Sequence, residues 1–314
     1  MTADLLCMGE PMLEFNQLPA KPDGSRHYLE GHGGDTSNAA VAAARQGARV
    51  GMITALGRDM PGDSFMALWQ REGVDTGTVL RTDRGPTGVY FVTHDAAGHH
   101  FLHYRTGSAA ACYRASDLPL DAIAGARMLY VSGISQGISA SACDAVFAAI
   151  DHAVAHGVKV AYDTNYRPRL WPPARAAAVM HAAMARAKYA MPGVEDVQTL
   201  TGLTDPDAML DFYLRLGCNV VVLKMGAEGS YLATADGREH VPAHHVTAVD
   251  ATGAGDAFCG SFLARILAGD APRAAVRYAS VAAALKCTGY GAVGPIPRAE
   301  TVLAELARID APRR

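Results

Sequence analysis

The chain has 314 residues, with 28 Lys and Arg against 31 Asp and Glu, so its formal net charge is −3. Half of the residues are hydrophobic, which is enough to fill the core of one large domain or two smaller ones. The near-neutral balance lacks the concentrated basic face of nucleic-acid-binding proteins, and no apolar run approaches the ~18 residues that span a membrane. We therefore expect neither a nucleic-acid nor a membrane partner.

The cysteines are widely and irregularly spaced, and none forms a CxxC pair. This spacing argues against a disulfide scaffold or a zinc ribbon and is typical of proteins from a reducing compartment. We therefore expect buried free thiols in a cytoplasmic protein. The cysteines are Cys7, Cys112, Cys143, Cys218, Cys259 and Cys287.

Strand-like and helical runs alternate along the chain. The short apolar runs are 48–56, 128–132, 158–162 and 220–224. The alanine-rich helical runs are 37–46, 63–72, 140–156, 174–187 and 207–216. Continuous apolar strands separated by helices predict a doubly wound α/β fold, in which a mainly parallel sheet has helices on both faces. Ligands bind such sheets at the carboxyl ends of the strands, so the residues that follow each strand are the functional candidates.

Two stretches of β character break this alternation. Residues 16–32 are polar, and residues 87–104 alternate polar and apolar on either side of a turn at 95–98, which predicts a hairpin. We interpret them as a small β lid over the substrate cleft, although an ordinary surface hairpin is the alternative. The predicted lid comprises residues 10–32 and 87–105, and the predicted core comprises residues 1–9, 33–86 and 106–314.

The strongest local signal is the segment DATGAGDAF, from Asp250 to Phe258, which precedes an apolar helical run. Its small residues let backbone N–H groups converge, and the start of a helix adds the positive end of its dipole. Such a cradle stabilises the negative charge that develops during phosphoryl transfer. Asp256 lies inside it, where a carboxylate repels phosphate but can accept a proton from a substrate hydroxyl. The alternative is a glycine turn with an aspartate helix cap.

A second glycine segment lies early in the chain, where Gly33 and Gly34 are followed by Asn38 near a helix start. Paired glycines let a ligand approach the backbone closely, which suggests recognition of sugar hydroxyls. The alternative is a plain turn in which Asp35 or Ser37 caps the helix.

Together the two segments resemble those of the ribokinase-like sugar kinases, the phosphofructokinase-B family. The early pattern GG-x-x-x-N-x-A is met at residues 33–40, and the late signature is met at 250 and 253–256. A third stretch, at 57–62 and 73–76, is similar to the family's G-x-D-x-x-G and GVDT elements. Order and spacing agree over nearly the whole chain.

The resemblance implies a ribokinase-like fold with a small β lid. It also implies an enzyme that uses Mg²⁺ to transfer the γ-phosphate of ATP to a sugar hydroxyl. Whether the enzyme also requires a monovalent cation is left open. In this resemblance Asp256 is the general base, and the amides of Gly253, Ala254 and Gly255 form the anion hole. The residues implied to contact the sugar are Gly33, Gly34, Asn38 and Asp250. The residues implied to lie along the nucleotide are Lys224, Gly226 and Gly229.

The expected metal element departs from the family pattern. The family's N-x-x-E element should follow Pro192, but Gly193 stands in place of the asparagine and Asp196 occupies the acidic position. We carry the metal role over to Asp196, with its neighbour Glu195 as the rival.

Two further segments, 103–110 and 163–171, resemble those of 2-keto-3-deoxygluconate kinases. Guanidinium groups bind carboxylates in a bidentate way, whereas a neutral ketose offers no matching charge. We therefore expect Arg105 and Arg167 to hold the carboxylate of a sugar acid, and Tyr90 and Tyr104 to contact it from the lid. The alternative for each arginine is a surface ion pair.

The leading interpretation is an ATP-dependent kinase that phosphorylates the terminal hydroxyl of 2-keto-3-deoxygluconate. A fructokinase or another neutral keto-sugar kinase of the same family is the alternative. Outside the enzymes, the alternative is a non-catalytic sugar-binding regulator on the same fold. An apolar face of the lid also suggests a homo-oligomer formed through the lid.

Overall fold

The large sheet is the scaffold of the molecule. The computed structural model describes residues 3–19, 21–95 and 98–311. The strands from β11 to β5 run parallel, and β12 and β13 add an antiparallel hairpin at one edge. The order across the sheet is β13 (Gly237–Val241), β12 (Ser230–Thr234), β11 (Val220–Lys224), β10 (Tyr189–Ala190), β9 (Lys159–Asp163), β8 (Met128–Ser132), β1 (Leu5–Met8), β4 (Val50–Gly57) and β5 (Val79–Thr82).

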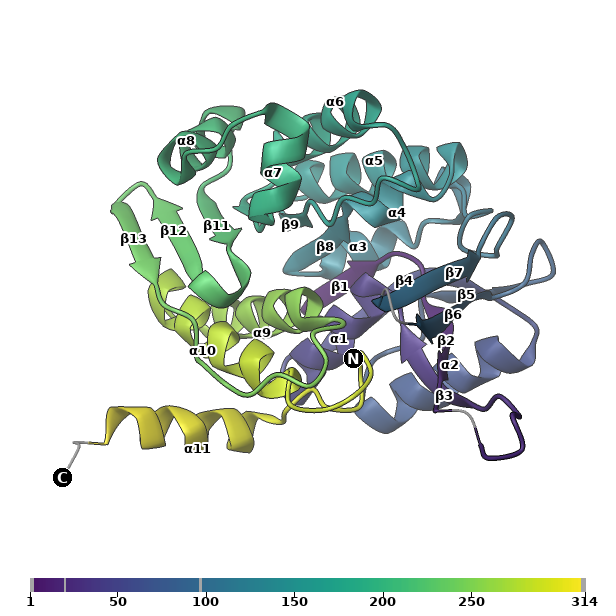
Figure 1. The fold of residues 1–314 in the computed structure, drawn as a ribbon. Coiled ribbons are helices and arrows are strands. Elements are labelled where there is room, and N and C mark those ends of the chain that lie inside the picture. The colour runs from purple at the N-terminus through teal and green to yellow at the C-terminus, as the bar shows by residue number, and fades with distance from the viewer. Residues whose placement is uncertain (1–2, 20, 96–97, 312–314) are drawn as a thin grey trace.

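Helices cover both faces of this sheet because its strands are apolar on both sides. In β1, Leu5 and Cys7 enter one core and Leu6 and Met8 enter the other, since successive side chains point to opposite faces. The first face is covered by α1 (Asp35–Arg45), α2 (Met60–Glu72), α9 (Ala254–Ala268) and α10 (Pro272–Lys286). The second is covered by α3 (Leu120–Gly125), α5 (Ala140–Ala155), α6 (Pro173–Met184), α7 (Val194–Thr201) and α8 (Pro206–Leu216). The predicted doubly wound α/β fold is confirmed, and Figure 1 shows the two helical layers.

The remaining helices are short or peripheral. The short α4 (Gly133–Gly137) follows β8 directly, and the 3₁₀ turns are η1 (Ala115–Asp117) and η2 (Gly226–Glu228). The last helix, α11 (Ala299–Asp310), packs on α10 through the buried Val302 and extends at the lower left of Figure 1. No helix in the described ranges is long and apolar enough to cross a membrane.

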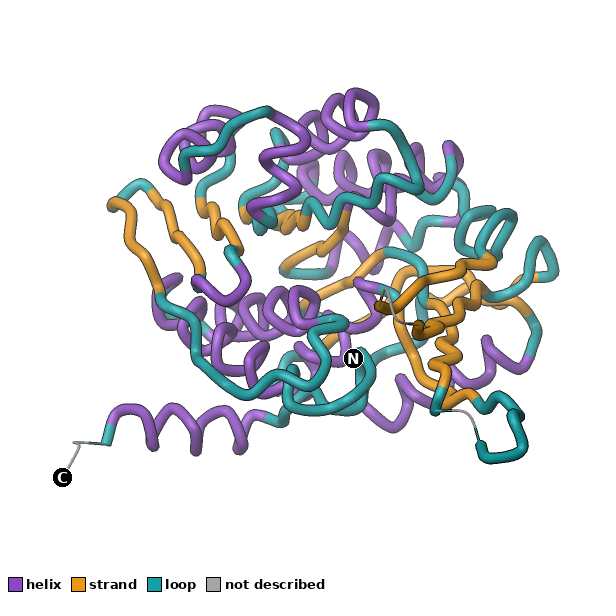
Figure 2. The backbone as a smooth tube through the Cα atoms, in the orientation of Figure 1, coloured by secondary structure: helices purple, strands orange, loops and turns teal. Residues whose placement is uncertain are grey.

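Four strands form a second, smaller sheet beside the large one. Its order is β3 (Tyr28–Gly33), β2 (Met12–Gln17), β6 (Gly88–Asp95) and β7 (Gly98–Tyr104). The strands β6 and β7 are the predicted hairpin, although residues 96–97 of its turn lie outside the described ranges. In Figure 2 this group of strands lies to the right of the large sheet. Its action as a lid, and the exact lid boundaries, stay predictions.

The cysteines are all free thiols. Cys7, Cys143, Cys218 and Cys259 are buried as predicted, whereas Cys112 and Cys287 are only partly buried. The expectation of buried thiols is therefore wrong for these two, because Cys112 lies in a surface loop and Cys287 follows the last turn of α10.

Candidate active site

The site begins where the first turns of α1 and α9 meet. Nδ2 of Asn38 donates to Oδ2 of Asp256 at 2.8 Å, across 218 residues of sequence. The helices approach closely at Gly260, where a Cβ atom would lie 2.1 Å from the carbonyl oxygen of Ala39. Asp256 is therefore no helix cap: α9 is capped by Gly253, and the carboxylate of Asp256 is held by another helix. The cap of α1 is likewise Gly34, without a side-chain cap from Asp35 or Ser37.

Asp256 is poised to exchange a proton near neutral pH. Burial and the charge of Asp35 raise the pKa of Asp256 to about 7, against the opposing effects of Asn38 and Arg167. A general base works best when its pKa lies near the working pH. The geometry therefore suits the predicted role of Asp256. Asn38 orients its carboxylate, and contact of Asn38 with the sugar stays a prediction.

Asp35 belongs to this site, although it was not among the predicted site residues. It is buried, and its Oδ2 accepts hydrogen bonds from Oγ of Ser132 and, at 3.1 Å, from Nδ2 of Asn165. Oδ1 has no partner within the described chain. Burial raises the pKa of Asp35, and its charge in turn raises the pKa of Asp256. Its position after the two glycines was the signal that could have identified it.

The N-terminus of α9 forms the predicted anion-binding cradle, with one correction. Gly253 adopts a left-handed conformation (φ 75°), and the N–H of Ala254 donates to the carbonyl of Ala251 at 3.0 Å. Ala254 is thus already paired, because its N–H closes the turn that builds the cradle. The N–H groups of Gly253, Gly255 and Asp256 have no acceptor in the described ranges. They and the helix dipole are available to an anion.

Asp250 organises the loop that precedes this helix. Its Oδ1 accepts from the N–H of Thr252 and its Oδ2 from the N–H of Gly291, both at 2.8 Å. Burial opposes ionisation, but these hydrogen bonds hold the pKa of Asp250 below its usual value. The buried Lys286 donates to the backbone carbonyl of Asp250 at 2.8 Å. The structure gives Asp250 this anchoring role, and its contact with sugar stays a prediction.

A cavity of about 320 Å³ lies on the other side of the cradle. The three residues predicted to lie along a nucleotide, Lys224, Gly226 and Gly229, all line it, together with Gly255 and Phe258 from the start of α9. This volume is within the range of small-molecule sites. The cavity therefore joins the predicted nucleotide residues to the cradle.

Lys224 links the cavity to the end of β9. Its Nζ lies 2.8 Å from Oδ2 of the buried Asp163. Burial by itself would lower the pKa of Lys224, but the Asp163 carboxylate raises it above its ordinary value, so the ammonium stays charged. Oδ1 of Asp163 has no hydrogen-bond partner in the described ranges. Asp163 was not among the predicted site residues, although it directly follows a predicted strand.

The metal prediction divides between its two candidates. Asp196 is mostly buried and accepts from Oγ1 of Thr164 at 2.7 Å and the N–H of Tyr166 at 3.1 Å. Burial raises the pKa of Asp196, and the charge of Asp163 adds to this effect. Glu195 is exposed and points in another direction from Asp196, because adjacent helical residues do not share a face, so the geometry favours Asp196 of the two.

These residues fit a Mg²⁺ ion that shares its coordination with phosphates. No group of three His, Cys, Asp or Glu side chains in the described ranges forms a metal cage. Mg²⁺ usually takes only one or two carboxylates and completes its shell with water and substrate phosphates. Asp196 and the unpaired oxygen of Asp163 supply that number of ligands near the cavity.

The small sheet places Tyr90 and Tyr104 on opposite faces. Tyr90 pairs with His103 across the strands and stacks on it at 5.6 Å between ring centroids, whereas Tyr104 pairs with Val89. Oη of Tyr90 donates to the buried Glu14 and lies against Gly33, close to the site. Tyr104 is 59% exposed. The period of two along a strand turns it away from Tyr90, so its contact with substrate stays a prediction.

The two predicted arginines lie near His103. Burial, together with the charges of Arg105, Arg169 and Arg167, lowers the pKa of His103 to about 4. The charge of Arg167 also lowers the pKa of Asp256, so Arg167 acts on both His103 and Asp256. Arg105 is engaged by Glu10 in a buried ion pair rather than a surface one. The charges of Arg105, Arg167 and Arg169 therefore all act at His103.

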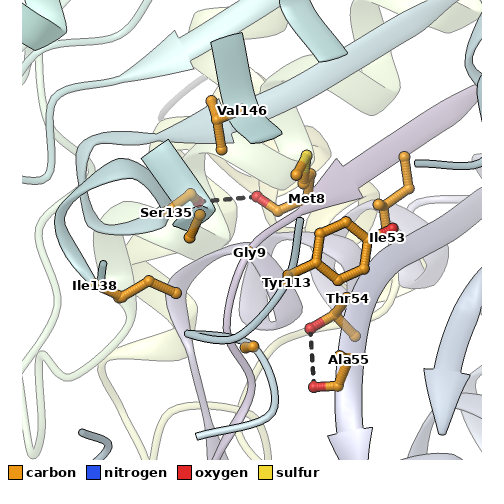
Figure 3. A pocket seen from close by; sticks show the side chains of 11 residues that line it. Met8, Gly9, Ile53, Thr54, Ala55, Tyr113, Ser135, Ile138 and Val146 are labelled. Carbon is orange, nitrogen blue, oxygen red and sulfur yellow. Dashed lines mark hydrogen bonds between the residues drawn. The ribbon is translucent and has the colours of Figure 1, made fainter. Parts of the chain in front are cut away.

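A second cavity, of about 20 Å³, is too small for a sugar. It is lined by Met8, Gly9, Tyr113 and Ser135 among others, and Figure 3 shows Oγ of Ser135 bonded to the carbonyl of Met8. This volume accommodates about one water molecule. It is a small gap behind the β1–β2 junction.

The fold, the cradle at the start of α9 and the ligand-sized cavity beside it are the features of a phosphotransferase. The chain matches the family model of the pfkB family carbohydrate kinases over residues 2–299 and belongs to that family. It is therefore a carbohydrate kinase.

Individual relatives agree with this assignment. A 2-dehydro-3-deoxygluconokinase of Thermoproteus tenax is 33% identical over 287 residues, which cover 90% of this chain and 87% of the relative. The enzyme of the same name from Bacillus subtilis is 30% identical, with 98% and 96% covered. Among solved structures, a fructokinase with bound ATP from Xylella fastidiosa has a TM-score of 0.89 at 26% identity and covers 99% of this chain and 100% of its own. The predicted ribokinase-like fold is confirmed.

Proposed function

We propose that this carbohydrate kinase uses ATP to phosphorylate the terminal hydroxyl of a sugar acid, 2-keto-3-deoxygluconate, in the cytoplasm. The proposal rests on Arg105, which the buried Glu10 holds at the end of β7, and on Arg167, whose charge acts on both His103 and the buried Asp256. The names of the relatives from Thermoproteus tenax and Bacillus subtilis support it, since 2-dehydro-3-deoxygluconate is the same compound.

In the proposed reaction, the sugar acid lies between the small sheet and the end of the large one. Asp256, held by Asn38, accepts the proton of the terminal hydroxyl. The hydroxyl oxygen bonds to the γ-phosphorus while the bond to the leaving ADP breaks. The amides of Gly253 and Gly255 stabilise the charge on the transferred group. Arg105 and Arg167 hold the carboxylate at the other end and so decide which hydroxyl reaches Asp256.

ATP would occupy the cavity of about 320 Å³, with its phosphates directed towards the cradle and Lys224. The ATP-bound fructokinase of the same fold supports this placement. When bound, Mg²⁺ neutralises charge on the phosphates, and Asp196 and Asp163 would hold it. Both carboxylates lie beside Lys224, whose ammonium offsets part of their negative charge.

A coupled assay of ADP release over 2-keto-3-deoxy acids and neutral ketoses tests the proposal. We expect the highest kcat/KM with 2-keto-3-deoxygluconate. Replacing Arg105 or Arg167 with Ala should raise KM for the acid at least about tenfold, because each loses a charge-assisted hydrogen bond. Neutral ketoses should show little change in KM with either variant. No ADP release with any sugar or sugar acid would favour a non-catalytic regulator.

A neutral keto-sugar kinase is the second candidate, favoured by the structural similarity to a fructokinase. It predicts the highest kcat/KM with fructose. In that case Arg105→Ala and Arg167→Ala would leave KM for fructose nearly unchanged, since fructose carries no charge for them to bind.

A further inference from the structure

Glu10 lies where the chain leaves the large sheet for the small one, between β1 and β2. Its side chain is 0% exposed. Oε2 accepts hydrogen bonds from Nε of Arg105, at 2.7 Å, and from Nη2 of the same residue. Oε1 accepts from Oγ of Ser108. Because Arg105 directly follows β7, this carboxylate joins the first and the last crossings between the two sheets.

The pair leaves one edge of Arg105 uncommitted. Glu10 engages Nε and Nη2, and nothing in the described ranges accepts a hydrogen bond from Nη1. The side chain of Arg105 retains 14% exposure. Its neighbour His103 lies on the face of β7 that carries Tyr90, close to Arg167 and Arg169. Arg105 therefore belongs to the group of arginines whose charges act at His103, and its Nη1 edge is free to meet a ligand.

We propose that Glu10 is a positioning residue for substrate specificity, which fixes Arg105 so that its Nη1 edge meets the carboxylate of the sugar acid. The inference rests on the proposed function. An arginine in solvent loses rotamer freedom when it binds a ligand, whereas one already held by a buried carboxylate has lost that freedom on folding. Glu10 thus converts a flexible cation into a preorganised one.

Glu10→Gln is the direct test, because it keeps the shape and an acceptor oxygen but removes the charge. We expect KM for 2-keto-3-deoxygluconate to rise at least about tenfold, with kcat within about threefold and KM for ATP unchanged, since the lost interaction orients the ground state as much as the transition state. An unchanged KM for the acid in the folded variant overturns the proposal.

Glu72→Gln is the matched control. Glu72 is also buried, with 4% exposure, and its two oxygens hold Nε and Nη2 of Arg45 at 3.0 and 2.9 Å between α2 and α1. This variant should lower Tm without changing KM for either substrate. If Glu10→Gln behaves in the same way, Glu10 has only a structural role.

Two further variants keep the test decisive. If Glu10→Gln fails to fold, Ser108→Ala serves instead, because it removes the hydrogen bond to Oε1 of Glu10 and keeps the ion pair with Arg105. We expect this variant to raise KM for the acid by a smaller factor. An unchanged KM contradicts the proposal. Arg105→Ala distinguishes failure of the role of Glu10 from failure of the proposed function. If it raises KM for the acid while Glu10→Gln does not, only the role of Glu10 fails. If it leaves that KM unchanged, the carboxylate contact of the proposed function fails as well.

Discussion

At the scale of single residues, Asp256 has the two properties that a base requires. Asn38 fixes its orientation, and its pKa of about 7 lets it be ionised at working pH while still accepting a proton. We predict that Asp256→Asn lowers kcat by about 10²- to 10⁴-fold, the usual contribution of a general base. KM for the sugar and Tm should stay near the wild-type values, because the amide has the same shape. Steady-state kinetics and thermal melting measure both; a near-normal kcat would rule out the base role.

The charge of Asp35 should be visible in the pH profile. Asp256 is active as a base only when deprotonated, so kcat/KM should fall as the pH drops through about 7. Asp35 raises the pKa of Asp256, so Asp35→Asn should move this acidic limb to lower pH. The control is Asp270→Asn, which removes a carboxylate paired with Arg265 at the far end of α9 and should leave the limb in place. A limb that does not move in Asp35→Asn would contradict the coupling.

At the scale of elements, the close contact of α1 and α9 determines the geometry of the base. A Cβ at position 260 would lie 2.1 Å from the carbonyl oxygen of Ala39, so Gly260→Ala must push the helices apart. We predict a loss of about 1–3 kcal/mol in the free energy of unfolding, as for other overpacked cores. A fall in kcat should accompany it, because Asn38 moves with α1.

The control for this variant is Gly294→Ala. A Cβ there would have no neighbour closer than 4.0 Å, at the carbonyl oxygen of Tyr290. Urea denaturation and kcat should both match the wild type. Equal effects of the two substitutions would show that the helix contact at Gly260 does not determine the position of Asn38 relative to Asp256.

The sequence predicted some elements better than others. Apolar runs such as 128–132 and 220–224 coincide with β8 and β11, because buried parallel strands are hydrophobic on both faces. The hairpin of β12 and β13 was missed, since β13 is an exposed edge strand with the polar sequence GREHV. Helix α10 was missed as well. The glycine signature at 250–256 predicted only the helix that directly follows it, α9.

At the scale of the whole molecule, the last helix is tied to the wall of the proposed nucleotide cavity. Nε2 of His244, which lines the cavity, lies 2.9 Å from Oε1 of Glu305 on α11. We predict that Glu305→Gln raises KM for ATP about three- to tenfold and leaves KM for the sugar acid unchanged, because only the cavity wall loses its support. The exposed Glu300→Gln on the same helix should change neither constant. Initial-rate kinetics with each substrate varied in turn measure this, and an unaltered KM for ATP would exclude the coupling.

The sequence by itself determined the fold class, the family and the positions of the candidate base and of the cradle, because these depend on local composition and on short motifs. It could not determine which side chains meet. The pairing of Asn38 with Asp256, the burial of Asp35 and the capture of Arg105 by Glu10 join residues far apart in the chain. The same holds for Tyr104, whose direction follows from strand register. Only the tertiary structure decided these points, since burial and contact between distant segments arise when the helices and the two sheets pack together.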